Sequence, residues 1–98
     1  MNDAHVAVWR WWFGLTDYEA TWLSHLYGEG AAWSSVASLR DRFHVSKAQV
    51  RVQISRLRTA LEPEAIDSAP GLGYRLTDAG LGECRGALWA MGEELIRA

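Results

Sequence analysis

The sequence predicts a fold of the α+β class that is mainly α-helical. Two capping boxes, which begin at Thr16 and Ser46, each predict the start of a helix. Residues 69–72, Ala-Pro-Gly-Leu, suit a type II turn between two short strands. A long apolar stripe after Thr77 predicts a last helix. With 98 residues and one cysteine, the chain is expected to form a single domain, residues 1–98, without disulfides or a cysteine-based zinc site.

Residues 1–14 are predicted to form a tryptophan-rich arm or strand. The segment 5–13, HVAVWRWWF, alternates weakly, and both sides of an extended chain would be largely apolar. Such a strand would be covered on both faces. Trp9, Trp11 and Trp12 then belong either to this packing or to an exposed patch that docks onto RNA polymerase or another regulator.

Residues 15–77 are predicted to form the core. The box at Thr16 begins a helix over residues 17–27, and two glycines follow it. A second helix is expected at about 35–43. The box at Ser46 begins a third helix over 47–61, which Pro63 ends. Two capped helices joined by about three residues predict a helix-turn-helix.

The third helix is followed by a predicted hairpin, with strands at 66–69 and 73–76 and the turn between them. Three helices and then a hairpin indicate a winged helix-turn-helix, with residues 66–76 as the wing. Thr77 would cap the last helix, roughly 78–97, within a C-terminal segment 78–98. Its apolar stripe either forms a dimer seam or packs back on the first helix of its own chain. The stripe consists of Leu81, Cys84, Leu88, Met91 and Leu95.

The net charge of −2 hides an uneven charge distribution. Residues 1–37 sum to −3 and residues 62–98 to −4. Between them, residues 38–61 hold six basic side chains against Asp41 alone, a net +5. Such a segment is typical of a surface that binds a polyanion, and equally of a helix face that stays solvated.

The third helix would offer DNA a face of small side chains. The positions opposite its buried stripe are Ala48, Val52, Ser55 and Thr59. Small residues allow close approach to base edges, where Val52 can meet a thymine methyl, Gln49 or Gln53 can pair with adenine, and arginine can pair with guanine. Arg51 and Arg56 flank this face, and Lys47 lies at its N-terminal end. Phosphate contacts are expected from Arg40, Arg42, Arg58 and the hydroxyls of Ser34 and Ser35.

Two motifs resemble the effector domain of OmpR/PhoB-type transcription factors. Residues 50–61 follow the recognition-helix pattern V-x-V-x-I-x-R-L-R-x-x-L, and residues 71–76 follow the wing pattern G-x-G-Y-R-hydrophobic. LTDYEATWLSHL, at 15–26, is similar to the opening of that domain, so the resemblance covers about residues 6–77. It implies a recognition helix in the major groove and a wing on the adjacent backbone or minor groove. Matching positions imply helix contacts by Gln53, Ser55, Arg56 and Arg58 and a wing contact by Ser68. Arg75 of the wing motif is a further candidate DNA contact.

The sequence also departs from that family. Pro70 stands where the wing usually carries a basic residue. No receiver domain precedes the module, so no phosphorylation control of the usual kind is expected. The end of the chain looks instead like MarR- or PadR-like winged helices, whose C-terminal helix dimerises.

These observations predict a transcription regulator that binds double-stranded DNA as a homodimer. The alternative is a winged-helix adaptor that docks through the tryptophan-rich arm. No nucleophile–base arrangement, phosphate-cradling glycine loop or ligand spacing among the histidines indicates an enzyme, a cofactor or a metal. No membrane span or signal peptide is expected, and a cytoplasmic bacterial or phage protein is the simplest interpretation.

Overall fold

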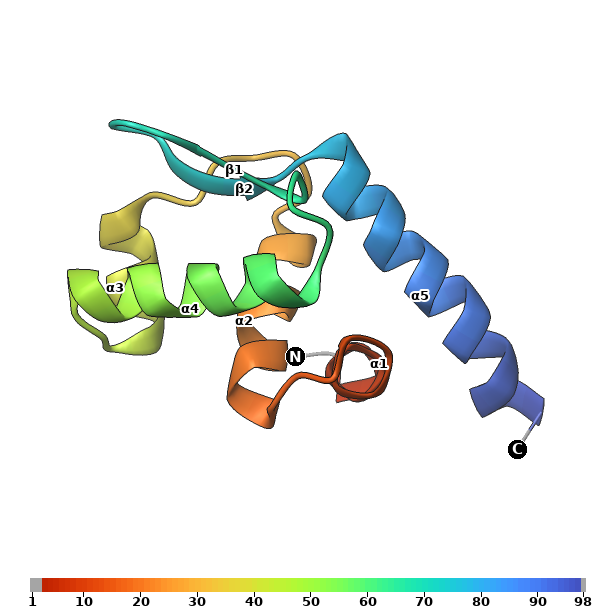
Figure 1. Cartoon of the computed structure of the whole chain (residues 1–98). Helices are drawn as coiled ribbons and strands as arrows, with labels where there is room; N and C mark the ends of the chain where they lie inside the picture. The colour runs from red at the N-terminus through yellow and green to blue at the C-terminus, as the bar shows by residue number, and fades with distance from the viewer. Residues whose placement is uncertain (1–2, 98) are drawn as a thin grey trace.

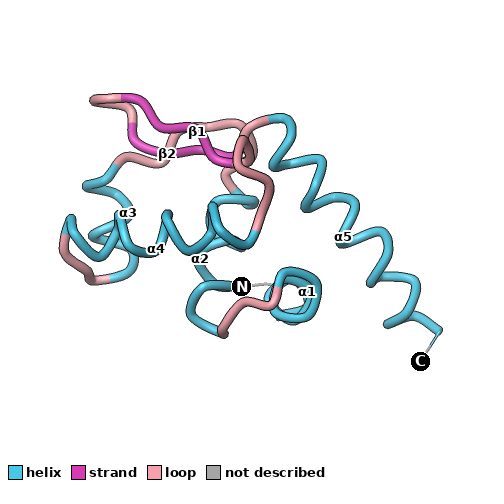
Figure 2. The backbone as a smooth tube through the Cα atoms, viewed as in Figure 1, coloured by secondary structure: helices cyan, strands magenta, loops and turns pink. Residues whose placement is uncertain are grey.

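The computed structural model describes the backbone of residues 3–97 and the side chains of residues 4–92. This part of the chain is an α+β fold, mainly helical, with one two-stranded antiparallel sheet (Figures 1 and 2). The elements are α1 (Asp3–Phe13), α2 (Asp17–Gly28), α3 (Val36–Phe43), α4 (Lys47–Ala60), β1 (Ile66–Ala69), β2 (Gly73–Leu76) and α5 (Asp78–Arg97). The predicted core elements are thereby confirmed, most of them to within one residue.

The prediction of a strand or arm at residues 5–13 is wrong, because this segment is the helix α1. Nearly every side chain in it is apolar, so the pattern shows no clear period of either two or 3.6 residues. The helix buries Val8 and Trp9 in the core, and the Trp9 indole Nε1 donates to Ser24 Oγ at 2.8 Å. Tertiary packing against α2 therefore decides the conformation of this segment.

The helices α2, α3 and α4 begin where the sequence predicts caps. Thr16 and Ser46 each form a complete capping box. Ser35 is the N-cap of α3, and its hydroxyl accepts from the Ser38 amide at 3.0 Å. His44 then turns the chain from α3 into α4 in a left-handed conformation, with φ of 54°. The buried face of α4 consists of Val50, Ile54 and Leu57.

The hairpin lies against the start of α3. Its two strands pair in antiparallel register from Ile66 with Leu76 to Ala69 with Gly73. The predicted type II turn agrees with the φ of 79° at Gly71 and with the hydrogen bond of 3.1 Å that the Leu72 amide donates to Ala69 O. Ser34 adds a bridge to the second strand, with reciprocal backbone bonds to Tyr74 of 2.7 and 2.9 Å. The hairpin, α3 and α4 therefore form one side of the molecule (Figure 1).

The helix α5 lies on the other side and packs against α1 (Figure 1). Thr77 caps it by accepting from the Gly80 amide at 3.1 Å, as predicted. Leu81 and Cys84 belong to the chain's own core, and Leu88 and Met91 pack against that core. The side chain of Leu95 lies outside those described. The described part of the apolar stripe is thus covered within the chain, which favours the alternative that it packs on the protein's own helices, while homodimerisation stays a prediction.

Candidate nucleic-acid interface

The outward face of α4 matches the face predicted for base contacts. Ala48, Val52, Ser55 and Thr59 are all exposed, and Val52 retains 47% of its accessible surface. Thr59 Oγ1 donates to Ser55 O within the helix at 3.1 Å, which satisfies its hydroxyl locally. The result is a shallow helix surface without long side chains along its centre, which a flat or grooved partner can approach closely.

A groove of about 770 Å³ lies between the starts of α3 and α4 and the hairpin. Arg40 lines it from α3, Lys47 and Arg51 from α4, and Ser68 with Pro70 from the hairpin. None of the described residues that line this groove is acidic. Lys47 and Arg51 are exposed and form no ion pair with any described side chain. The groove therefore collects positive charge that nothing in the described chain neutralises.

Arg42 does not join this groove, although the sequence grouped it with Arg40. It lines a different hollow together with His5, His25 and Glu29. The two arginines are separated because they stand two residues apart on a helix and so face different directions.

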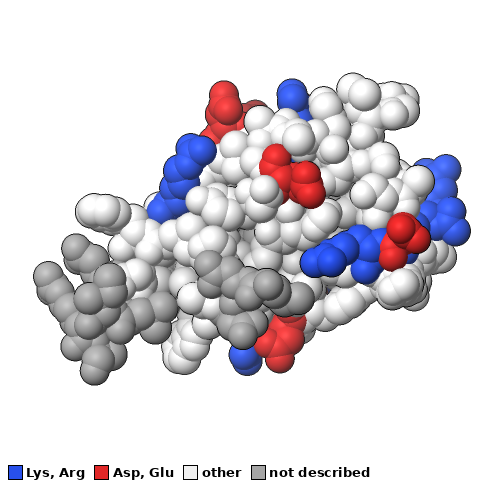
Figure 3. Space-filling view, turned by 180° about the vertical axis from the view of Figure 1, so that it is seen from behind, with Lys and Arg blue, Asp and Glu red and all other residues white. Residues whose placement is uncertain are grey.

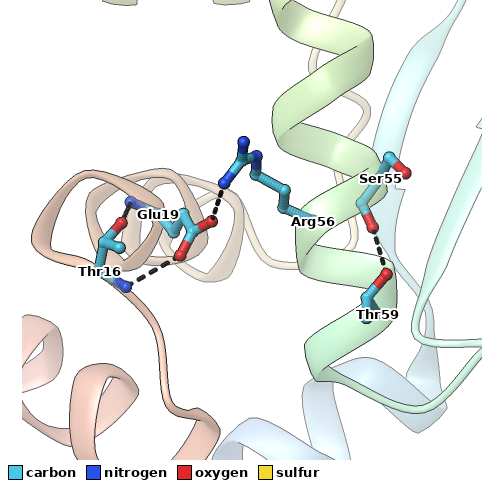
Figure 4. Close-up of polar contacts among 5 residues, drawn as sticks. All are labelled: Thr16, Glu19, Ser55, Arg56 and Thr59. Carbon is cyan, nitrogen blue, oxygen red and sulfur yellow. Dashed lines mark hydrogen bonds and ion pairs between the residues drawn. The ribbon is translucent and has the colours of Figure 1, made fainter.

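Arg56 is held against α2, as Figure 4 shows. Its Nη1 lies 3.4 Å from Glu19 Oε2, and Glu19 Oε1 accepts from the Thr16 amide at 2.9 Å. The pKa of Glu19 is lowered, chiefly by this Thr16 amide bond. Burial is the next-largest effect and opposes the shift, and the Thr16 hydroxyl and Arg56 lower the pKa further. Glu19 is therefore a charged acceptor for Arg56, a role that no local sequence pattern had revealed.

Arg58 of α4 contacts the hairpin, and Arg75 of β2 contacts side chains on either side of it. Arg58 Nη2 donates to Ile66 O at 3.4 Å, and its guanidinium lies 5.9 Å from the centre of the Tyr74 ring. Arg75 lies 3.6 Å from Asp67 and stacks 4.2 Å over the Trp33 ring. Arg58, predicted as a phosphate contact, thus connects α4 to the hairpin in the free protein.

Three polar candidates are less accessible than the sequence suggested. Ser34 is 4% exposed and its buried hydroxyl has no partner, so its prediction as a surface phosphate contact is wrong. Gln53 is half-buried, and its Oε1 is buried without a hydrogen bond. Gln49 is exposed, but its Oε1 accepts from the Ser46 amide at 2.8 Å as part of the capping box. An amide contact to adenine would require either glutamine to reorient.

The tryptophans of α1 divide between core and surface. Trp9 is fully buried, whereas Trp11 is 81% and Trp12 48% exposed. Trp22 of α2 is buried and stacked on Phe43. Trp89 on α5 is 78% exposed. Three tryptophans of the described side chains, two on α1 and one on α5, therefore remain exposed to solvent.

The face opposite to Figure 1 shows basic and acidic side chains scattered over a largely uncharged surface, some of them side by side with one of opposite charge (Figure 3). Among the described residues, no cluster of three or more histidines, cysteines or acids could hold a metal ion. Within residues 3–97, no helix combines the length and apolar character needed to cross a bilayer. Comparison of the chain with protein-family models, curated proteins and solved structures finds no match.

Proposed function

We propose that this protein is a winged-helix DNA-binding protein that regulates transcription, with α4 as the recognition helix and the hairpin as its wing. The observation that carries the proposal is the acid-free groove beside the exposed face of α4, where Arg40, Lys47 and Arg51 converge. Duplex DNA matches this chemistry, because a regular array of phosphates flanks a groove wide enough for a helix.

In this arrangement α4 enters the major groove with its small-residue face toward the bases. Val52 contacts a thymine methyl, and Arg51 reaches either a base edge or a phosphate. Arg40 and Lys47 bind the backbone that lies between α4 and the wing. In the part of the wing that lines the groove, Ser68 offers one hydroxyl and Pro70 offers only an apolar surface. Neither residue is charged, so the wing contributes less electrostatic affinity for DNA than α4 does.

The test is selection of bound sequences from a random DNA pool, followed by fluorescence-anisotropy titration of the selected duplex at several salt concentrations. Each phosphate contact contributes about 0.9 to the slope of log K against log salt. Lys47→Ala should lower this slope by about one contact, and Arg85→Ala, an exposed arginine on α5, should leave it unchanged. If the unmodified protein at micromolar concentration shows no salt-dependent binding, DNA binding is refuted.

A protein adaptor is the second candidate function, supported by the exposed indoles of Trp11 and Trp89. Large apolar side chains on a surface are typical of interfaces. RNA polymerase or another regulator would be the partner. Trp11→Ala should abolish such docking while leaving the DNA titration unchanged, so the two functions can be separated. Homodimerisation is part of the proposal for DNA binding, and mass measurement at tens of micromolar protein tests it.

A further inference from the structure

Glu19 connects the start of α2 to the recognition helix proposed above. One carboxylate oxygen accepts the Thr16 amide at 2.9 Å, and the other lies 3.4 Å from Arg56 Nη1. The Glu19 side chain is only 12% exposed, whereas that of Arg56 is 61% exposed. The acid is therefore a fixed anchor, and the arginine extends from that anchor into solvent.

Arg56 occupies the edge of the exposed face of α4. It lies one helical turn beyond Val52, on the side that faces α2 and away from the hairpin groove. Its guanidinium has five N–H donors in a rigid fork, and the contact with Glu19 uses Nη1 alone. The remaining donors stay available at the rim of the surface that would face DNA.

We propose that Glu19 is a positioning residue, which holds Arg56 in the orientation that binds a DNA phosphate on the α2 side of the recognition helix. This inference rests on the proposed DNA-binding function. A free arginine must lose its rotamer freedom to bind, and an arginine already in contact with Glu19 has lost part of it before binding.

Positioning and simple electrostatics predict effects of opposite sign. Glu19 carries a negative charge near the DNA-facing surface, so electrostatics alone predicts that removing this charge tightens binding. Positioning predicts that removing it weakens binding, because Arg56 then has to be ordered by the DNA itself. The rotamer entropy of a free arginine sets a ceiling of about 30-fold on this loss.

The experiment is a double-mutant cycle with Glu19→Gln and Arg56→Gln, measured by anisotropy on the selected duplex. Glutamine keeps an oxygen for the Thr16 amide and is an accepted partner in capping boxes, so the helix start is preserved. Asp17→Asn is the matched control, since it removes an exposed charge from the same helical turn without touching Arg56. Thermal unfolding of each variant confirms that it is folded at the assay temperature.

We expect Glu19→Gln to weaken binding at least threefold in the unmodified protein and to have no weakening effect in the Arg56→Gln protein. Arg56→Gln should also lower the salt slope by about 0.9. Asp17→Asn should leave binding unchanged or tighten it slightly. Tighter or unchanged binding by Glu19→Gln, or an equal loss in both backgrounds, overturns the positioning role while DNA binding stands. Absence of salt-dependent binding by the unmodified protein refutes the function and this inference together.

Discussion

Gly73→Ala tests whether the bridge between Ser34 and Tyr74 holds the hairpin in place. A Cβ at Gly73 would lie 2.0 Å from Ser34 O and 2.7 Å from Ser35 Cα, and both are backbone atoms that cannot rotate away. The residue also has φ of 103°, where a side chain costs about 1–3 kcal/mol. Separating the backbones would break the two hydrogen bonds of the bridge, for a further 1–3 kcal/mol or so. We therefore expect a loss of about 2–6 kcal/mol in the free energy of unfolding.

Gly71→Ala is the control for backbone strain. Its φ is 79°, but no atom lies within 4 Å of the added Cβ, so only the strain is incurred. The difference between the two variants in urea-induced unfolding isolates the bridge, about 1–3 kcal/mol. Amide hydrogen exchange at Ser34 and Tyr74 should accelerate in Gly73→Ala alone. Equal destabilisation by the two variants, with both amides still protected, would refute this account of how the hairpin is anchored.

Three further outcomes follow from burial. Trp9→Ala should cost about 3–5 kcal/mol in urea unfolding, whereas Trp11→Ala on the exposed side of the same helix should change stability by less than about 0.5 kcal/mol; equal costs would contradict the assigned orientation of α1. Burial lowers the pKa of His25 below its ordinary value of 6.5, so the unfolded chain binds more protons than the folded one just below that pH. The free energy of unfolding should therefore fall as the pH drops through 6.5. His25→Gln should flatten this part of the stability profile, and an unchanged profile in this variant would argue against a role for His25. Burial raises the pKa of the Cys84 thiol to about 12, so little reactive thiolate forms in the native protein at pH 8. A disulfide reagent should then react with Cys84 only at the rate of unfolding. Rapid reaction in the native protein would contradict the packing of α5 on α1.

The sequence predicts α2 to α5 and the hairpin well because their signals are local. A capping box needs four neighbouring residues, and the turn at Ala69–Pro70–Gly71–Leu72 needs only the φ preferences of proline and glycine. The conformation of α1 could not be predicted in this way. Its period is obscured by consecutive apolar residues, and the decisive contact, from Trp9 to Ser24, joins residues 15 positions apart.

The candidate interface shows the same division. The exposure of Val52 follows from the helical period of α4, and the structure agrees with it. The pairing of Arg56 with Glu19, 37 positions away, depends on how α2 and α4 pack, and no local pattern encodes it. Ser34 was misjudged for a related reason. The residue was predicted as an exposed phosphate contact, but the bridge to Tyr74 buries it one position before the N-cap of α3, Ser35.

The basic side chains of α4 divide into two that contact other elements and two that form no ion pair with a described side chain. Arg56 ties its middle to α2, and Arg58 ties its C-terminal end to the hairpin. Lys47 and Arg51, in its N-terminal half, form no ion pair with a described side chain and lie beside Arg40 in the acid-free groove. Under the proposed function, the middle and the C-terminal end of α4 are therefore held by other elements, while Lys47 and Arg51 in its N-terminal half meet the phosphates. This arrangement explains how a chain of net charge −2 can carry a strongly basic binding surface, because local and not total charge acts within a Debye length of about 10 Å.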